Sequence, residues 1–390
     1  MQSVQSQCRG SQVTLRLAWL GLCVSSVPAL PAQQVPTWSL VTPEASFPEP
    51  FDNLRGAREL SDGRLIVLDV GFFVVSLSRG IRAPLGRSGD GPGEYRLPLR
   101  LFGLRGDTTA YIDMARPRKL LLIQPSGELR GSLEITGGLN VSDPEAADGR
   151  GMIYSQHRRT KGPPISRDST DIVGWDLATG RRDTVAAVME RKVISSLRSP
   201  LRPGPPPPFF THGQWSVSWD GRVAGVSVEP YQVTLFNPDR TVIAGPVIPT
   251  EQFLVTDAHR QAWLEKAMEP IAVLSMASSG SPVSSYRRRT RSDVEPAAWP
   301  KYLPPFLPRA LSFAPDGMLW VLRTTEDPYL PVFDVIDKTG RLSGRLALPR
   351  GRRLLCHGKA GVYLVRVDED GLQYIEHYRL PNGYRDAASR

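Results

Sequence analysis

The sequence is poor in cysteine and histidine, the side chains that most often bind metals or act as nucleophiles. Only three cysteines and five histidines occur in 390 residues. Cys8 and Cys23 fall in an N-terminal segment that we expect to be removed, which leaves Cys356 alone and excludes an intramolecular disulfide in the mature chain. No two histidines lie within five residues of one another, so the local spacing of a zinc site is absent. We therefore assign no catalytic and no metal-binding residue from the sequence, and the cofactor content stays unknown.

Lysine is scarce as well, although the chain is basic. Lysine and arginine number 48 against 39 acidic residues, a formal net charge of +9, and only seven of the 48 are lysines. The densest basic group, Arg287–Arg291, lies in a segment rich in Ser, Gly and Pro. We expect a solvated loop there, with contact to an anionic partner as the alternative. No aromatic residue alternates with these arginines, which argues against a stacking surface for nucleic acid, and we expect no nucleic-acid partner.

Long hydrophobic runs are missing beyond the N-terminus. The apolar run Leu17–Val27 covers 11 residues with two serines, whereas a bilayer span needs about 20. It follows Arg9 and Arg16 and precedes a stretch of prolines and alanines, which is typical of an export signal. We expect residues 1–32 to be a signal peptide. No later segment has the length and hydropathy of a membrane span, so we expect no transmembrane segment.

The same segment fixes the expected location. Cys23 raises the alternative of a lipid anchor, but Leu22 stands where a small residue is expected before a lipidated cysteine. An exported protein in the periplasm or outside the cell, without a lipid, is the preferred interpretation.

Glycine and proline are abundant, with 35 and 36 copies, so many short strands separated by turns are expected. Asp-Gly and related turns, each followed by a short apolar stretch, recur along the chain and are typical of hairpins. The glycines that mark these turns are Gly63, Gly106, Gly149, Gly221, Gly317 and Gly361. Their intervals are 43, 43, 72, 96 and 44 residues. A repeat of about 40–50 residues with several strands is typical of a β-propeller.

Two insertions account for the long intervals, one at about 161–210 and one at about 250–308. The sequence therefore predicts an all-β fold: a six-bladed β-propeller with one helical and loop insertion, forming a single domain over residues 33–390. Each blade can bury its sheet faces only against its neighbours.

The second insertion holds the one predicted helix, over Asp257–Met268 with Thr256 as N-cap. Packing over the propeller is its expected role, with a lid over a ligand as the alternative. Arg287–Trp299 is expected to be an exposed loop. An N-terminal strand near Trp38 is expected to complete the last blade, because a closed ring removes exposed strand edges.

Specific motifs resemble those of the NHL-type and related TolB-like six-bladed propellers of secreted bacterial proteins. Gly89–Pro98 is similar to their Gly-x-Gly-Pro-Gly-x-aromatic-x-x-Pro segment, and Asp62–Asp69 is similar to their Asp-Gly-x-Leu-Tyr-Val-x-Asp segment. Phe236–Asp239 and Ile336–Gly340 are similar to a third element, a phenylalanine followed by Asp-x-x-Gly. The resemblance implies the fold and leaves the function open, since such propellers include enzymes, binding proteins and scaffolds.

The resemblance raises two kinds of enzymatic site, the histidine cluster of propeller lyases and the calcium site of propeller lactonases. The histidine cluster of the propeller lyases has no counterpart here. In calcium-dependent propeller lactonases carboxylates converge on the channel, and the resemblance implies that Glu59, Asp69 and Asp113 could contribute to such a site. Hydrogen bonding in hairpin turns is the alternative role of the two aspartates.

Arginines recur at one place in the predicted repeat. Arg55, Arg309 and Arg353 stand eight residues before the marker glycine of their units, and Arg100 stands six residues before Gly106. These positions correspond to the start of the innermost strand, near the mouth of the central channel. Four converging guanidinium groups would bind a carboxylate, a phosphate or an acidic sugar. The alternative is that each arginine pairs with a neighbouring carboxylate.

The sequence therefore favours a binding or interaction module. We expect a monomer that binds a protein, peptide, carbohydrate or anionic ligand at the channel mouth. The alternative is a channel-centred, metal-dependent hydrolase or lyase, in which carboxylates or histidines of several inner strands would meet within metal-bonding distance.

Overall fold

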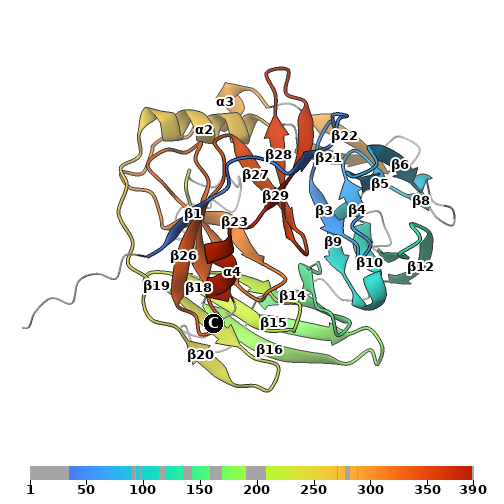
Figure 1. The fold of residues 1–390 in the computed structure, drawn as a ribbon, viewed down its shortest axis with the longest axis horizontal. Coiled ribbons are helices and arrows are strands. Elements are labelled where there is room, and N and C mark those ends of the chain that lie inside the picture. Colours follow the sequence, from blue (N-terminus) through green and yellow to red (C-terminus); the bar gives the residue numbers. More distant parts are fainter. Residues whose placement is uncertain are drawn as a thin grey trace, which may run out of the picture. The chain divides into compact units, whose positions relative to one another are not determined.

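Six sheets follow one another along the chain and form the blades of a propeller (Figure 1). The computed structural model describes residues 35–89, 91, 94–96, 98–113, 119–134, 143–158, 169–189, 208–269, 271–276, 282–287 and 289–388. Residues Val35–Arg390 form one compact unit. The predicted signal peptide and Cys23 lie outside the described residues. Of the predicted 161–210 insertion, the structure describes residues 169–189, which form two strands of the third blade, and residues 208–210. None of the described helices is long and apolar enough to cross a membrane.

The first three blades have four antiparallel strands each. Blade one contains β3 (Gly56–Glu59), β4 (Leu65–Leu68), β5 (Phe72–Ser76) and β6 (Ile81–Leu85). Blade two contains β9 (Pro98–Gly103), β10 (Thr109–Asp113), β11 (Lys119–Ile123) and β12 (Leu129–Glu134), with a 3-10 turn, η1 (Arg105–Asp107), between β9 and β10. Blade three contains β13 (Ala146–Ala147), β14 (Met152–Arg158), β15 (Ser169–Asp176) and β16 (Arg182–Met189). A two-strand pair, β7 (Arg87–Ser88) and β8 (Glu94–Tyr95), links blades one and two.

The last three blades include the N-terminal strands. Blade four contains β17 (Gln214–Val217), β18 (Val223–Val228), β19 (Tyr231–Phe236) and β20 (Val242–Ala244). Blade five contains β23 (Phe306–Phe313), β24 (Leu319–Arg323), β25 (Val332–Ile336), β26 (Leu342–Ala347) and β1 (Thr37–Ser39). Blade six contains β27 (Arg352–His357), β28 (Gly361–Val367), β29 (Gln373–Arg379) and β2 (Ala45–Ser46), and the chain ends in α4 (Asn382–Ala388).

Five of the six marker glycines lie in the connection between the first and second strands of a blade, and Gly361 is the first residue of the second strand of blade six, as the spacing predicted. Gly63, Gly221 and Gly317 have φ values of 83°, 85° and 85°, a left-handed conformation that glycine adopts at little cost. The first strands β3 and β9, and β3 and β27, contact one another, so the first strands are innermost and blade six meets blade one. We call the face where these innermost strands begin the top face, and the face of the marker turns the bottom face.

The core lies between blades rather than within them. Between blades five and six, for example, Trp320, Phe333 and Leu346 pack against Val362 and Leu364, all 3% exposed or less. The middle strands are therefore apolar on both faces, as in the fully buried β4. Each blade depends on its neighbours for burial, which is the behaviour expected of stacked repeats.

Ring closure differs from the prediction in its detail. The strand that completes blade six is β2, antiparallel to β29, whereas the strand at Trp38, β1, runs parallel to β26 as a fifth strand of blade five. The Trp38 ring packs edge-on against Tyr384 of α4 at 5.5 Å and lies over Gly344, where a side chain would overlap it. Packing of this tryptophan therefore directs β1 to blade five.

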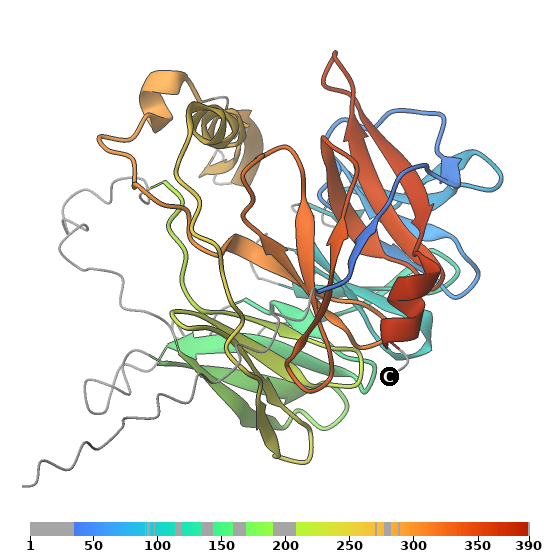
Figure 2. The ribbon, with the colours of Figure 1, turned by 60° about the vertical axis from the view of Figure 1, so that its left-hand side comes forward.

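The second insertion lies on the top face (Figures 1 and 2). It contains α2 (Asp257–Met268), the hairpin β21 (Ile271–Met276) and β22 (Pro282–Arg287), and α3 (Arg291–Val294). The predicted helix and its Thr256 cap are confirmed. The loop predicted over residues 287–299 instead contains α3, whose Thr290 and Asp293 form a capping box.

Candidate functional site

The structure places the four predicted arginines at the innermost strands, near the top face. Arg100, Arg309 and Arg353 lie in β9, β23 and β27, and Arg55 directly precedes β3. They belong to blades two, five, six and one respectively. The positions inferred from the repeat spacing are therefore the ones observed.

Three of these arginines reach the main chain of the following blade. Each donates a hydrogen bond to a carbonyl oxygen at or just before the next innermost strand, because a guanidinium offers several donors in a fixed plane. The bonds are Arg353 Nη2 to Leu54 O (2.5 Å), Arg55 Nη1 to Pro98 O (3.2 Å) and Arg100 Nη1 to Glu145 O (3.3 Å). Joining of blades is thus one role of these side chains, and among the residues that the structure describes, only Arg100 of the three also has a carboxylate within ion-pair distance, Glu145 at 3.9 Å.

Arg309 differs from the other three. Its φ is 66°, and the register of β23 against β24 shifts around it. Gln214 of blade four holds the main chain on both sides, since its Nε2 donates to Leu307 O at 2.8 Å and its Oε1 accepts from Ala310 N at 3.1 Å. The Arg309 side chain is exposed and makes no hydrogen bond or ion pair with any residue that the structure describes.

The Arg309 backbone carries a cost. A left-handed conformation costs an L-residue with a side chain about 1–2 kcal/mol. Such conformations persist where the surroundings fix them, and they concentrate at functional sites. The hydrogen bonds of Gln214 on both sides of Arg309 are such a surrounding, and they hold a guanidinium group whose donors have no partner in the described part of the chain.

Arg353 lies close to the insertion. Its side chain is exposed, yet the surrounding protein lowers its pKa, because the desolvation outweighs the attraction of Glu269. Glu269 directly follows α2, so the insertion brings a carboxylate towards the top end of β27. The helix is fastened to the β24–β25 loop of blade five, where Tyr329 Oη donates to Glu265 at 3.3 Å and His259 Nε2 lies 2.9 Å from Thr325 O.

Further along β27, Cys356 and His357 are held in their neutral forms. Burial raises the pKa of the Cys356 thiol, so the nucleophilic thiolate is disfavoured. Burial lowers the pKa of His357 to about 4. Its Nε2 lies 3.0 Å from Ser312 Oγ, and its ring packs edge-on against Trp320 at 4.7 Å. Neither side chain is prepared for nucleophilic or acid–base chemistry near neutral pH.

The three carboxylates considered for a metal have protein partners. Glu59 accepts hydrogen bonds from Tyr363 Oη at 2.7 Å and Lys359 N at 2.5 Å. Asp69, which is fully buried, accepts from Asn53 N at 2.5 Å. The third carboxylate, Asp113, accepts a hydrogen bond from the main-chain N–H of Arg96 at 2.9 Å. Within the described ranges, no three His, Cys, Asp or Glu side chains are placed to hold one metal ion.

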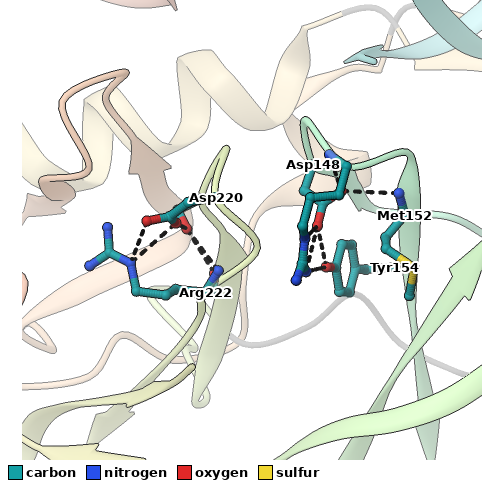
Figure 3. A network of polar contacts seen from close by, with 7 residues as sticks. Asp148, Met152, Tyr154, Asp220 and Arg222 are labelled. Carbon is teal, nitrogen blue, oxygen red and sulfur yellow. Dashed lines mark hydrogen bonds and ion pairs between the residues drawn. The ribbon is translucent and has the colours of Figure 1, made fainter. Parts of the chain in front are cut away.

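A polar network at the bottom face was not predicted (Figure 3). Asp148 is fully buried, and its carboxylate accepts from Tyr154 Oη at 2.7 Å, Arg150 Nε at 2.8 Å and Met152 N at 3.0 Å. Burial and the Asp148 carboxylate raise the pKa of Tyr154. The phenol therefore stays protonated and serves as a hydrogen-bond donor.

The sequence carries a signal for this network. The triplet Asp-Gly-Arg occurs at residues 62–64, 148–150 and 220–222, each time at a marker glycine. In each case the arginine pairs with the aspartate two residues before it. Two of these arginines also reach a neighbouring blade, Arg64 by donating to Pro125 O at 2.8 Å and Arg222 by donating to Gly317 O at 3.4 Å. The triplets thus fasten blades together at the bottom face.

Trp219 extends across the bottom ends of the innermost strands. It is 50% exposed, and its main-chain oxygen accepts from Gly149 N of blade three at 2.9 Å. Its ring lies against Gly149 and Gly103 of blade two, where side chains would collide with it. Three consecutive blades therefore meet around this ring.

No protein-family model and no curated protein sequence matches the chain. Among solved structures, regucalcin, a calcium-binding protein from Agrobacterium tumefaciens, is similar at 11% identity and a TM-score of 0.39, covering 89% of this chain and 97% of that one. Virginiamycin B lyase from Staphylococcus aureus is similar at 9% identity and a TM-score of 0.37, with coverages of 88% and 98%. A protein of unknown function from Bacteroides thetaiotaomicron reaches a TM-score of 0.41 at 9% identity, with coverages of 88% and 74%. Similarity this distant indicates nothing about activity, and the strand order of the chain itself identifies a six-bladed β-propeller.

Proposed function

We propose that this propeller is a binding module that takes an anionic group of its ligand at the top mouth of the channel, with Arg309 as the principal contact. The observation that best supports this proposal is the Arg309 side chain, which is exposed and has no partner among the described residues. Gln214 meanwhile holds the Arg309 backbone in a conformation that costs free energy. A clamped backbone limits the ordering cost that binding imposes.

Several features support an anion as the ligand group. A free guanidinium binds a carboxylate or a phosphate through two parallel hydrogen bonds. The net charge, +9 for the full sequence and still positive without Arg9 and Arg16 of residues 1–32, also attracts anions over longer distances. The group could belong to a peptide, a protein or an acidic carbohydrate. We further propose that the protein acts as a monomer in the periplasm or outside the cell, after loss of residues 1–32.

The test is thermal unfolding of the purified protein with sulfate, phosphate, citrate and galacturonate. A ligand present at a hundredfold excess over its Kd stabilises the native state by about 2.7 kcal/mol. We expect Arg309→Ala to abolish the stabilisation. Arg79→Ala, which removes an exposed arginine from the β5–β6 turn, is expected to preserve it. Equal stabilisation of both variants by every anion would contradict the proposal.

A second variant separates binding from folding. Arg309→Gly relieves the left-handed strain, so we expect the ligand-free protein to gain about 1 kcal/mol in unfolding free energy, or to lose none, while anion binding disappears. Chemical denaturation measures the first quantity and calorimetric titration the second. If a divalent metal raised the unfolding temperature and a chelator reversed the increase, the alternative of a metal-dependent enzyme would be favoured instead.

A further inference from the structure

A cavity of about 380 Å³ opens between blades three and four at the bottom face. Its rim comes from the bottom turns of both blades, on the far side of the propeller from the predicted anion site. Small-molecule sites have volumes of roughly 300–1,000 Å³ and combine an apolar lining with a few polar groups. The volume and position of this cavity fit such a site.

The lining divides into an apolar floor and a basic rim. The floor is made by Met152 and Val185 of blade three and by Val223 and Phe236 of blade four. The rim carries three guanidinium groups, those of Arg150, Arg181 and Arg240, and two carboxylates, those of Asp176 and Asp183. A ligand that fills this cavity would therefore meet hydrocarbon at one end and a rim with an excess of positive charge at the other.

Two of the rim arginines hold the walls in place. Arg240 crosses from blade four to blade three, where it donates to Thr184 O at 2.6 Å and pairs with Asp183. Arg150 is held by Asp148 and lies over Gly221, where a side chain would overlap the guanidinium. Burial by itself would lower the pKa of Arg150, but the bonds to Asp148 and Tyr154 outweigh it, so the group stays charged.

Arg181 has a different position. It is exposed on the β15–β16 turn, and its side chain makes no hydrogen bond or ion pair with any described residue. Asp176 lies nearby, and the main-chain amides of Ala178 and Thr179 donate to its Oδ1 at 2.8 and 3.2 Å. Those bonds, more than the field of Arg181, keep the pKa of Asp176 below its usual value. The donors of Arg181 are thus available at the rim.

We propose that this cavity binds a small organic acid with an apolar body. Its carboxylate or sulfonate contacts Arg181, and its hydrocarbon part packs on the floor formed by Met152, Val185 and Phe236. This site is separate from the top mouth, so the protein can bind such an acid whether or not Arg309 binds an anion.

The probe is 8-anilinonaphthalene-1-sulfonate, an aromatic anion whose fluorescence rises in apolar surroundings. We expect the folded protein to bind it, phenylacetate to displace it, and benzylamine, of similar size and opposite charge, to leave it bound. Arg181→Glu should weaken the affinity about tenfold or more, because one charge-assisted contact is replaced by repulsion. Arg79→Glu, an equal change of charge on an exposed turn of blade one, should change it by less than about twofold.

Near-UV circular dichroism identical to that of the unmodified protein would show that the variants remain folded. Unchanged dye affinity in Arg309→Ala would support a site distinct from the top mouth. Equal weakening by Arg181→Glu and Arg79→Glu, or displacement by benzylamine as effective as by phenylacetate, would overturn the proposal. Dye binding lost only in Arg309→Ala would overturn it as well.

Discussion

Replacing Asp148 with alanine is expected to lower the free energy of unfolding by about 2–3 kcal/mol. The carboxylate is fully buried and accepts hydrogen bonds from the main chain at residues 150 and 152, from the Arg150 guanidinium and from Tyr154 Oη. Its removal leaves the two main-chain N–H groups and the Arg150 Nε without an acceptor and the buried Tyr154 hydroxyl without an acceptor for its proton, although Arg150 Nη2 still donates to Tyr154 Oη at 2.9 Å, and buried polar groups cost free energy when they are unpaired. Urea denaturation followed by circular dichroism measures the loss.

The chain contains its own matched control. Asp62 occupies the same place in the first Asp-Gly-Arg triplet and pairs with Arg64 at 2.7 Å, but its side chain is 51% exposed. Exposed ion pairs contribute about 0–1 kcal/mol, so Asp62→Ala should cost no more than that. Equal losses of unfolding free energy in Asp148→Ala and Asp62→Ala would mean that the burial of Asp148 does not determine how much it stabilises the protein.

Acidification from pH 6.5 to pH 4 is expected to destabilise the protein through His357 by about 3 kcal/mol. Its folded-state pKa of about 4 lies below the ordinary value of 6.5, because burial disfavours the charged ring. Its Nδ1 is buried without a hydrogen-bond partner among the described residues. Well above pH 6.5 the ring is neutral in both the folded and the unfolded protein, so the free energy of unfolding is not reduced by its titration. As the pH falls, protons bind the unfolded chain first, so stability is lost progressively until the folded-state pKa is passed.

Other groups also titrate in this range, so the measurement is a difference between two proteins. His357→Gln removes the titrating ring, and the pH dependence of its unfolding free energy should be flatter than that of the unmodified protein between pH 6.5 and 4. Parallel curves would contradict a depressed His357 pKa.

Much of the architecture could be predicted because each blade repeats a local signal. Four of the six marker glycines, Gly63, Gly106, Gly221 and Gly317, have the positive φ that favours glycine, and the spacing of all six predicted the number of blades. The α2 helix carries its own N-cap in Thr256, which is also local. The position of β1 depends instead on where Trp38 packs, and the partners of that ring at Gly344 and Tyr384 are some 300 residues away in the sequence.

In the candidate site, too, local features could be predicted from the sequence and long-range contacts could not. Repeat spacing placed the arginines on the innermost strands, but it could not give their partners. Arg353 bonds to Leu54 O, 299 residues away, and this contact exists only once the ring has closed. The left-handed backbone of Arg309 could not be predicted, because no glycine stands at that position. The conformation is held by the side chain of Gln214, which belongs to another blade. The Asp-Gly-Arg triplets were visible in the sequence, but their pairing into inter-blade contacts was not.

The most direct test of an anion site at Arg309 is a crystal structure of the protein soaked in selenate, a tetrahedral dianion that can be located by its anomalous scattering. We expect an anomalous peak within hydrogen-bond distance of the Arg309 guanidinium, and no such peak in crystals of Arg309→Ala. Peaks at other arginines, with Arg309 free of selenate, would contradict it.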